Sequence, residues 1–215
     1  MIISRGRGYV FVHIPKTGGT SLATVLEARA KSDDILIGDT PKAKRRAKRQ
    51  KTLPAKGRLW KHSTLTDIDG LVSEQDLRRL FVFTLVRNPW DRVVSYYYWL
   101  RDQNFDHPAV ALARRSRFSE FLNAPSTGAS LRAWPAARYV TTAGGAERCD
   151  AFLRLEHLGT DLPRIEQHLG FTLGDLPHLN RSDRPAIYRE AYSDEDAALV
   201  GCLCAEDVER FGYRF

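Results

Sequence analysis

Three apolar runs in this chain are typical of buried strands, and each leads toward a helix-like pattern. They are YVFVHI (9–14), LFVFTLV (80–86) and DAFLRLEHL (150–158), which are rich in β-branched and aromatic residues. Strands separated by long crossovers pair in parallel, and the crossover helices cover the faces of the sheet. The sequence therefore predicts a three-layer α/β fold with a central parallel sheet flanked by helices.

Helical spacing and capping signals predict the remaining elements. The expected helices are 19–30, 73–80 with Ser73 as N-cap, one that begins at Pro89, 161–169 between Thr160 and Gly170, and a last one from Ser193 to Phe211. A short strand with a turn is expected in RLWKHSTL (58–65), and short helices and loops are expected in 105–145.

The organisation along the chain predicts one domain. The 215 residues are enough for a sizeable core, and 43% of them are hydrophobic. Neither an internal repeat nor a linker between two cores is present, so residues 1–215 are expected to form a single domain. Residues 31–58 are polar, basic and poorly periodic, and they are expected to form an excursion outside the core.

The sequence shows no targeting or membrane signal. No apolar run approaches the roughly 20 residues that span a membrane. The apolar part of MIISRGRGYVFVHI is too short for a signal-peptide core, and no small-residue cleavage site follows it. A cytoplasmic location is therefore expected. The three cysteines, Cys149, Cys202 and Cys204, make neither a disulfide framework nor a zinc-spaced group.

The net charge of +7 comes from one segment. KAKRRAKRQK (42–51) holds seven basic residues and no acid, and the rest of the chain has 26 basic and 26 acidic residues. Three interpretations stay open, in this order: a solvated, mobile segment, a patch that attracts an anionic acceptor such as an acidic saccharide, or a nucleic-acid contact. No aromatic residue interleaves with the cations, so nucleic acid is not expected as a partner.

The stretch FVHIPKTGGTSL (11–22) joins the first predicted strand to a helix. A helix start offers backbone N–H groups and the positive end of the helix dipole to an anion. Glycines allow close approach, a lysine adds charge and hydroxyl groups add donors. The order differs from a Walker loop, because Lys16 precedes the glycines. Alone, the stretch fits either a phosphate loop or a turn with a solvated lysine.

A second strand end carries a similar signal. In TLVRNPWDRVVSYYY, Arg87 follows the predicted strand and Ser95 lies two helical turns later. Arg87 suits bidentate bonds to a phosphate, and Ser95 suits one more bond. The alternative is that Arg87 simply pairs with Asp91. Two anion-suited strand ends in one sheet favour an anion-binding function more strongly than either stretch alone.

These stretches resemble a known family. HIPKTGGTSL and FTLVRNPWDRVVSYYY resemble the two cofactor signatures of sulfotransferases that use 3′-phosphoadenosine 5′-phosphosulfate (PAPS). WKHSTLTDI and the C-terminal segment that begins HLNRSDRP resemble the branch of bacterial and carbohydrate sulfotransferases. The resemblance implies a fold like that of P-loop NTPases, with a central parallel sheet. It covers less than half of the chain.

The resemblance also implies roles for individual residues. Lys16 matches the lysine that stabilises the leaving phosphate, while Arg87 and Ser95 match the pair that binds the 3′-phosphate. The residues that match the 5′-phosphate loop are Thr17, Gly18, Gly19, Thr20 and Ser21. Asn180 and Arg181, in PHLNRSDRP, are candidate nucleotide contacts, although a purely structural loop is an equal alternative.

The implied reaction moves a sulfuryl group from PAPS to a hydroxyl or amine acceptor by in-line displacement, with charge building on the leaving oxygen. The resemblance implies that no metal is needed, and FVFTLVR ends in Arg87 where a Walker B strand ends in an acid. Among six histidines, His62 is the candidate base because it lies in WKHSTLTDI. Glu156, another histidine such as His178, and a surface role for His62 stay open.

The sequence leaves the acceptor and the oligomeric state undefined. A saccharide or small metabolite is expected as acceptor. Two other functions compete: a P-loop nucleotide kinase or phosphotransferase, and a non-enzymatic nucleotide- or RNA-binding protein. The sequence lacks the Walker order of lysine and glycines and the Walker B acid that a kinase would need. A nucleotide- or RNA-binding protein would depend on the basic run.

Overall fold

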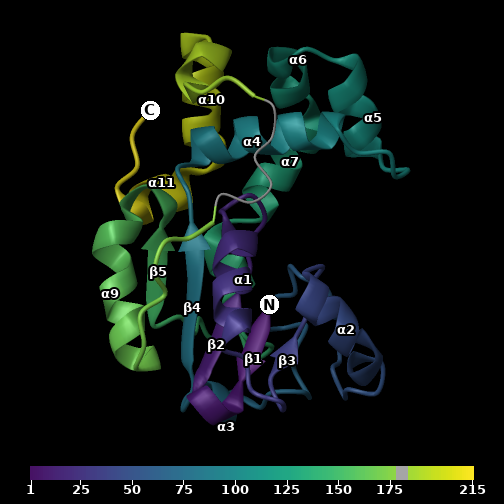
Figure 1. Cartoon of the computed structure of the whole chain (residues 1–215). Helices are drawn as coiled ribbons and strands as arrows, with labels where there is room; N and C mark the ends of the chain where they lie inside the picture. Colours follow the sequence, from purple (N-terminus) through teal and green to yellow (C-terminus); the bar gives the residue numbers. More distant parts are fainter. Residues whose placement is uncertain (178–183) are drawn as a thin grey trace. The chain divides into compact units, whose positions relative to one another are not determined.

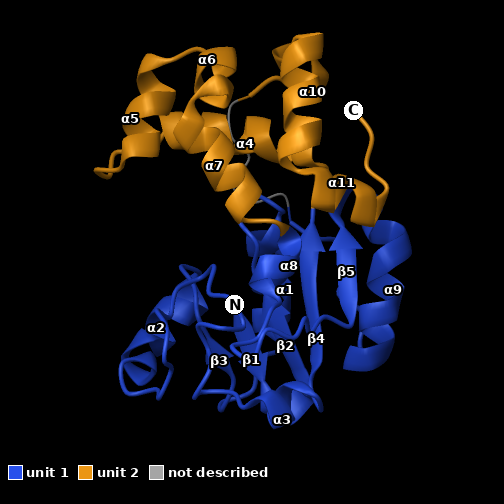
Figure 2. Cartoon of the chain, turned by 180° about the vertical axis from the view of Figure 1, so that it is seen from behind, with its two compact units in different colours: residues 1–86, 136–179 blue, residues 87–135, 180–215 orange. Residues whose placement is uncertain are grey.

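The computed structural model describes residues 1–177 and 184–215. The chain divides into two compact units, and each unit combines two segments of the sequence (Figure 2). Unit 1 contains residues 1–86 and 136–179, and unit 2 contains residues 87–135 and 180–215. The boundary at residue 86 falls between the strand and the helix of the second anion-suited stretch. The single domain over 1–215 stays a prediction.

Unit 1 is built on a five-stranded sheet in the order β3-β1-β2-β4-β5 (Figure 1). Its strands are β1 (Ile2–Ser4), β2 (Tyr9–Val12), β3 (Ile35–Leu36), β4 (Phe81–Val86) and β5 (Ala151–Arg154). β2, β4 and β5 pair in parallel, so the three predicted core strands are confirmed. β1 pairs antiparallel with both β2 and β3, which the sequence reasoning did not foresee.

The register of the parallel strands brings their carboxyl ends to one edge of the sheet. Val12, the last residue of β2, lies opposite Thr84 of β4. Val86, the last residue of β4, lies opposite Arg154 of β5. Because the carboxyl ends of parallel strands are where open α/β sheets bind ligands, the chain that follows Val12 is placed at the binding edge.

The core of unit 1 forms where aromatic strand residues meet two helices. Tyr9, Phe11 and Phe83 are fully buried, with ring centroids 5.4–5.6 Å apart. Leu22 and Leu26 of α1 (Gly19–Ala28) and Ile165 and Leu169 of α9 (Leu158–Leu169) join the same cluster. Unit 1 also contains η1 (Arg5–Arg7), α2 (Pro41–Gln50), α3 (Glu74–Leu77), α8 (Ala136–Tyr139) and η2 (Leu155–His157).

The basic run forms a regular helix, α2, rather than an irregular excursion. Thr40 caps it by accepting a hydrogen bond from the Ala43 N–H at 3.1 Å. Ala43 is fully buried, while Lys42 donates to the Glu27 carbonyl and Arg46 donates to the Asp34 carbonyl. The inner side of α2 is therefore attached to unit 1 by packing and by backbone contacts of its own cations.

Three local predictions are wrong in detail. Residues 58–65 form turns instead of a strand. β5 ends at Arg154 and passes through η2 into α9, which begins at Leu158 and not after Thr160. Asp161, in the first turn of α9, ties the helix to the end of β5, because its carboxylate accepts hydrogen bonds from the Arg154 backbone N–H at 2.8 Å and from the Arg154 guanidinium. Gly170 ends α9 in the left-handed conformation, as predicted.

Unit 2 is helical. It contains α4 (Pro89–Arg101), α5 (Pro108–Arg115), α6 (Phe118–Asn123), α7 (Pro125–Ala133), η3 (Tyr188–Ala191), α10 (Asp194–Leu203) and α11 (Ala205–Phe211). Ser193 caps α10 as predicted, but the predicted last helix breaks at Cys204 into α10 and α11. Tyr97 of α4 packs on Phe118 and Phe121 of α6, with ring centroids 5.2–5.3 Å apart. In the part of the chain that the structure describes, no helix combines the length and apolar character that crossing a membrane requires.

Candidate active site

The loop between β2 and α1 bends through two left-handed residues. Lys16 has φ +66°, the one positive φ at a non-glycine residue among those described, and Gly18 has φ +82° and caps α1. A left-handed lysine is strained, and such strain concentrates at functional sites. Left-handed residues within a turn direct backbone N–H groups into a common concavity that suits an anion. The loop therefore has the backbone shape of a phosphate site.

Packing restricts both glycines, and backbone conformation restricts Gly18 as well. A Cβ on Gly19 would overlap the ring of His13, which lies buried under the loop at 6% exposure. A Cβ on Gly18 would lie 2.9 Å from a methyl group of Leu155, on a residue whose φ already disfavours a side chain. The sequence reasoning assigned these glycines to close approach by the anion. The structure adds that His13 and Leu155 fill the space beneath them.

The hydroxyl groups of the loop differ in what they contact. Thr17 is 1% exposed, and its hydroxyl donates to the Ile14 carbonyl at 2.8 Å, so this hydroxyl stabilises the loop. Thr20 is half-buried and lines a pocket beside α1. Ser21 is buried in the first turn of α1. Thr20 therefore contributes a loop hydroxyl to this pocket.

His62 lies against His13, directly behind the loop. Its Nδ1 is 2.8 Å from the His13 carbonyl oxygen, and the two rings meet edge to face with centroids 4.7 Å apart. A carbonyl oxygen only accepts, so Nδ1 carries the proton and the lone pair of the neutral ring is on Nε2. Burial lowers the pKa of His62 to about 3. His62 is thus held as a neutral imidazole whose unprotonated nitrogen is Nε2.

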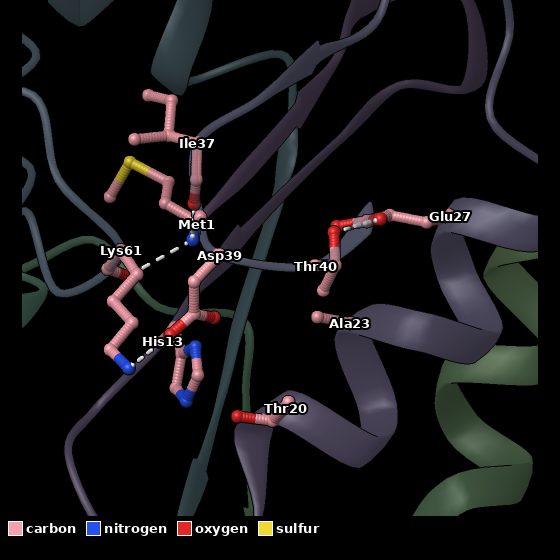
Figure 3. Close-up of a pocket in the computed structure, with 10 residues that line it drawn as sticks. Met1, His13, Thr20, Ala23, Glu27, Ile37, Asp39, Thr40 and Lys61 are labelled. Atoms are coloured by element: carbon pink, nitrogen blue, oxygen red, sulfur yellow. Dashed lines mark hydrogen bonds and ion pairs between the residues drawn. The ribbon is translucent and has the colours of Figure 1, made fainter. Parts of the chain in front are cut away.

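A small pocket lies beside the loop and along α1 (Figure 3). Its lining comes from the N-terminus, the loop after β2, α1, the segment between β3 and α2, and the residue before His62: Met1, His13, Thr20, Ala23, Glu27, Ile37, Gly38, Asp39, Thr40 and Lys61. Lys61 pairs with Asp39 at 2.6 Å. Glu27 accepts a hydrogen bond from Thr40 at 2.5 Å, and burial raises its pKa. Charged side chains of both signs therefore line the pocket.

Sequence reasoning missed Glu27 and Asp39. Glu27 lies two turns after Thr20 on α1, and this spacing was the available signal that both face one side of the helix. Asp39 comes from residues 31–58, which the sequence presented as polar, basic and poorly periodic. Neither residue matches a motif, so only the fold brings them to the pocket.

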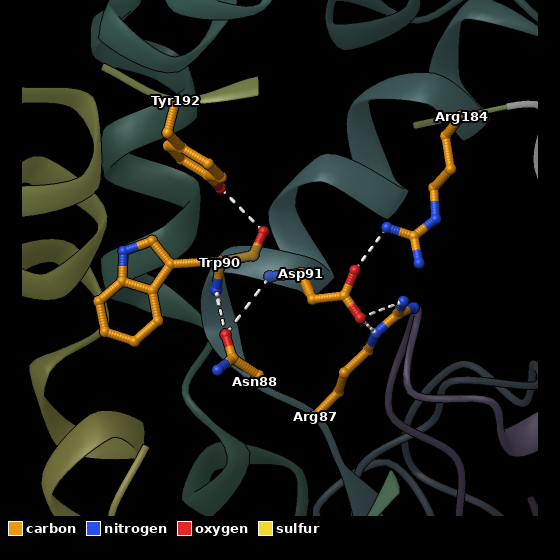
Figure 4. A network of polar contacts seen from close by, with 6 residues as sticks. All are labelled: Arg87, Asn88, Trp90, Asp91, Arg184 and Tyr192. Carbon is orange, nitrogen blue, oxygen red and sulfur yellow. Dashed lines mark hydrogen bonds and ion pairs between the residues drawn. The ribbon is translucent and has the colours of Figure 1, made fainter. Parts of the chain in front are cut away.

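In unit 2, a carboxylate joins two arginines (Figure 4). Asp91 accepts from Arg87 Nε at 2.8 Å and from its terminal nitrogen at 2.6 Å, and its other oxygen accepts from Arg184. The ion pair between Arg87 and Asp91, which the sequence left as an alternative, is present. Two guanidinium groups on one carboxylate leave a net positive charge, which is suited to a multiply charged anion.

The start of α4 is built by side chains. Asn88 caps the helix by accepting from the N–H groups of Trp90 and Asp91, and it donates to the Arg214 carbonyl at 3.0 Å. Trp90 donates to the Ala197 carbonyl at 2.8 Å. Ser95 lies buried on α4. The sequence identified Pro89 as the helix start but not Asn88 as its cap.

The predicted site residues fall into three groups. The residues brought together in unit 1 are Lys16, Thr17, Gly18, Gly19, Thr20, Ser21 and His62, and those in unit 2 are Arg87 and Ser95. Asn180, Arg181 and His178 lie outside the described residues. Among the other candidates, Glu156 is exposed in η2. Within the described ranges, no group of three or more His, Cys, Asp or Glu side chains suits a metal ion.

Two other histidines have structural roles. His107 caps α5 by accepting from the Ala109 N–H at 3.1 Å. His168 stacks on Phe81, with ring centroids 4.3 Å apart. These contacts account for both side chains without any role in catalysis.

Comparison with known proteins identifies the fold and the family. The fold is similar to that of mouse sulfotransferase SULT7A1, solved in complex with PAP (3′-phosphoadenosine 5′-phosphate), with a TM-score of 0.56. That match has 16% sequence identity and covers 95% of this chain and 86% of the mouse chain. A search of curated proteins found no match. The model of the sulfotransferase family matches residues 1–197, which is most of the sequence. The chain is therefore a member of the sulfotransferase family.

Proposed function

We propose that this sulfotransferase takes its sulfuryl group from PAPS and transfers it to a hydroxyl or amine acceptor. The observation that carries the proposal is the left-handed backbone at Lys16, at the carboxyl end of β2. The strand register adds that β4, the strand before Arg87, ends at the same edge of the sheet. The mouse neighbour, which was solved with PAP, supports the choice of donor.

The two strand ends are assigned to opposite ends of the nucleotide. The loop residues Lys16 to Ser21 bind the 5′-phosphosulfate through backbone N–H groups, the start of α1 and the Lys16 ammonium. Arg87 and Ser95 bind the 3′-phosphate. Asp91 orients the Arg87 guanidinium for this contact, because both of its bonds to Arg87 are already in place.

The reaction follows from these assignments. The acceptor oxygen attacks sulfur, the bond from sulfur to the leaving phosphate oxygen breaks, and negative charge develops on that oxygen. Lys16 and the loop N–H groups stabilise this charge and are oriented before the reaction begins. His62 Nε2 takes the acceptor proton, since Nδ1 is engaged with the His13 carbonyl.

The low pKa of His62 is compatible with this role. Burial disfavours the imidazolium in the free protein, where the pKa is about 3. A sulfuryl group brought next to Nε2 adds negative charge, which raises the pKa of a nearby histidine. The base is therefore fully deprotonated before binding and becomes a better proton acceptor when the donor is bound.

The acceptor is proposed to be a saccharide or another small metabolite. The exposed cations of α2 include Lys44, Arg45 and Lys48, and they favour an acceptor that carries negative charge. Deleting residues 42–51 would remove the buried Ala43 and unfold part of unit 1. Replacing Lys44 and Lys48 by Gln is the cleaner test of this role, and it raises the acceptor KM if α2 contacts the acceptor. The cytoplasmic location stays a prediction from the sequence.

The donor assignment is tested by ligand-induced stabilisation. PAP raises the melting temperature because a ligand that binds only the folded state stabilises it. ATP with Mg²⁺ produces a much smaller shift, and radiolabelled PAPS transfers its label to an acceptor in the absence of added metal. Stabilisation by ATP with Mg²⁺ and none by PAP would contradict the proposal.

A further inference from the structure

A row of side chains leads from the candidate base to solvent. It is formed by every second residue before Ser63, namely His62, Trp60 and Arg58. His62 contacts the ring of Trp60, edge to face, with centroids 5.0 Å apart. The Arg58 guanidinium lies over the Trp60 ring, 5.5 Å from its centroid. Trp60 is 43% exposed although it is one of the largest apolar side chains in unit 1. The exposed ring therefore lies beside the base and in reach of a bound molecule.

The position of Trp60 is determined by a buried hydroxyl. Ser63 is fully buried, and its Oγ accepts from the Trp60 N–H at 2.9 Å. The same Oγ lies 2.9 Å from the carbonyl oxygens of Arg58 and Trp60. This turn orders the backbone of both residues without a ligand. A side chain that is ordered in advance loses little conformational entropy when it binds.

Arg58 adds an anion-binding group to this ring. It is exposed, and among the described residues no carboxylate is within ion-pair distance of its guanidinium. Lys56, two residues earlier, differs because it pairs with Asp69 at 2.7 Å. Arginine that stacks on an aromatic ring keeps its outward N–H groups for a carboxylate or sulfate. The Arg58 charge is thus available to a ligand on Trp60.

We propose that Trp60 and Arg58 form the acceptor subsite, and that the acceptor is a ring-bearing acid. A flat ring face of the acceptor stacks on Trp60, its anionic group pairs with Arg58, and its reacting hydroxyl lies at His62 Nε2. This inference rests on the proposed function. Aromatic rings bind both aromatic molecules and the apolar faces of sugars, so an acidic sugar and an aromatic acid share the required chemistry.

Transfer of label from radiolabelled PAPS to four probes tests the subsite. The probes are a glucuronate-containing tetrasaccharide, its carboxyl-reduced neutral form, 4-hydroxybenzoate and neutral phenol. At least one acidic probe is expected to be sulfated with a lower KM than its neutral counterpart. The acidic probe with the lower KM, either the tetrasaccharide or 4-hydroxybenzoate, identifies the acceptor as an acidic sugar or as an aromatic acid. Sulfation of neutral probes alone, or of none of the four probes, would overturn the proposed acceptor class.

Variants of Trp60 and Arg58 test whether these side chains bind the acceptor. Trp60→Ala is expected to raise the KM of the preferred acidic probe about tenfold with a smaller change in kcat, and Trp60→Phe to restore most of it. Arg58→Gln raises the KM of the acidic probe but not of its neutral counterpart. Lys56→Gln is the matched control and changes neither KM. Equal KM values in wild type and Trp60→Ala, or equal effects of Arg58→Gln on acidic and neutral probes, would overturn the subsite.

PAP binding separates this test from the proposed function. Trp60 and Arg58 are not assigned to the donor, so both variants are expected to keep the PAP-induced rise in melting temperature. Loss of PAP binding in wild type would contradict the donor assignment itself. Retained PAP binding together with unchanged acceptor kinetics would contradict only the acceptor subsite.

Discussion

The two candidate phosphate sites follow parallel strands of the same sheet, but they are built differently. The loop after β2 is shaped by its backbone, with left-handed residues at Lys16 and Gly18 and the side chains of His13 and Leu155 packed against its glycines. The turn after β4 is shaped by side chains, with Asn88 as cap and Asp91 holding the Arg87 guanidinium. A backbone site depends on glycine and packing, whereas a side-chain site depends on charge. Substitutions should therefore impair the two sites in different ways.

The largest effect is expected at Lys16, where two variants distinguish the contribution of the backbone conformation from that of the side-chain charge. Lys16→Gly keeps the left-handed conformation and removes the ammonium, so PAP still binds while kcat falls by about 100-fold or more. Lys16→Ala removes the charge and also disfavours the backbone conformation. It is expected to weaken PAP binding as well. Equal PAP affinities for the two variants would show that the backbone conformation does not matter.

Arg87 is expected to give the next largest effect, and mainly on donor affinity. Arg87→Ala removes bonds to a charged phosphate and is expected to weaken PAP binding by roughly 10- to 100-fold. The control is Arg114→Ala, on the exposed side of α5. Calorimetric titration measures both. An unchanged affinity in Arg87→Ala would mean that Arg87 serves only its ion pair with Asp91.

Gly19 tests the packing beneath the backbone site. Gly19→Ala places a methyl group into the ring of His13 and is expected to lower the free energy of unfolding by about 1–3 kcal/mol. Gly159→Ala is a matched control, because a Cβ at this position of α9 meets no atom within 4 Å. Urea unfolding compares the two variants. Similar stabilities would show that His13 moves aside without cost.

The smallest effect is expected on the pH dependence of stability, and it comes from two histidines of unit 1. Burial holds the pKa of His62 at about 3 and the pKa of His13 well below its usual value of 6.5. At a pH between the folded-state pKa of each histidine and its ordinary value of 6.5, the unfolded chain binds protons that the folded chain does not. The contribution of the two neutral histidines to the free energy of unfolding is therefore fully present above pH 6.5 and declines as pH falls. Each histidine contributes a slope of up to about 1.4 kcal/mol per pH unit.

Chemical unfolding at pH 7 and pH 5.5 measures this slope. His62→Gln removes one of the two contributions and is expected to have a shallower slope than wild type. A slope that does not change with His62→Gln would show that the folded protein accommodates a charged imidazole at this position.

The core strands and both strand-to-helix turns could be predicted, because their signals are local. An apolar run, Pro89 at a helix start and adjacent glycines act within a few residues. β1 and β3 were missed because they have only three and two residues, and their stability comes from pairing with distant partners. The helix α2 was missed because its apolar periodicity is poor, although Thr40 and Pro41 carried a start signal.

The candidate site was predictable to the same extent. His62 was chosen from a resemblance, but its tautomer depends on a hydrogen bond to His13, 49 residues away. Arg184 meets Asp91 across 93 residues, and no spacing rule connects them. The pocket carboxylates Glu27 and Asp39 likewise become neighbours through the fold. Local motifs thus predicted the anion-suited turns, and long-range packing determined how each is supported.

Affinities for PAP and for adenosine 5′-monophosphate show whether both strand ends bind one nucleotide. Titration calorimetry measures the affinity of wild type and Arg87→Ala for each nucleotide. We expect wild type to bind PAP far more tightly than the monophosphate, which lacks the 3′-phosphate, and Arg87→Ala to weaken only PAP binding. Equal losses for both nucleotides, or no preference for PAP in wild type, would show that the two strand ends do not bind one nucleotide.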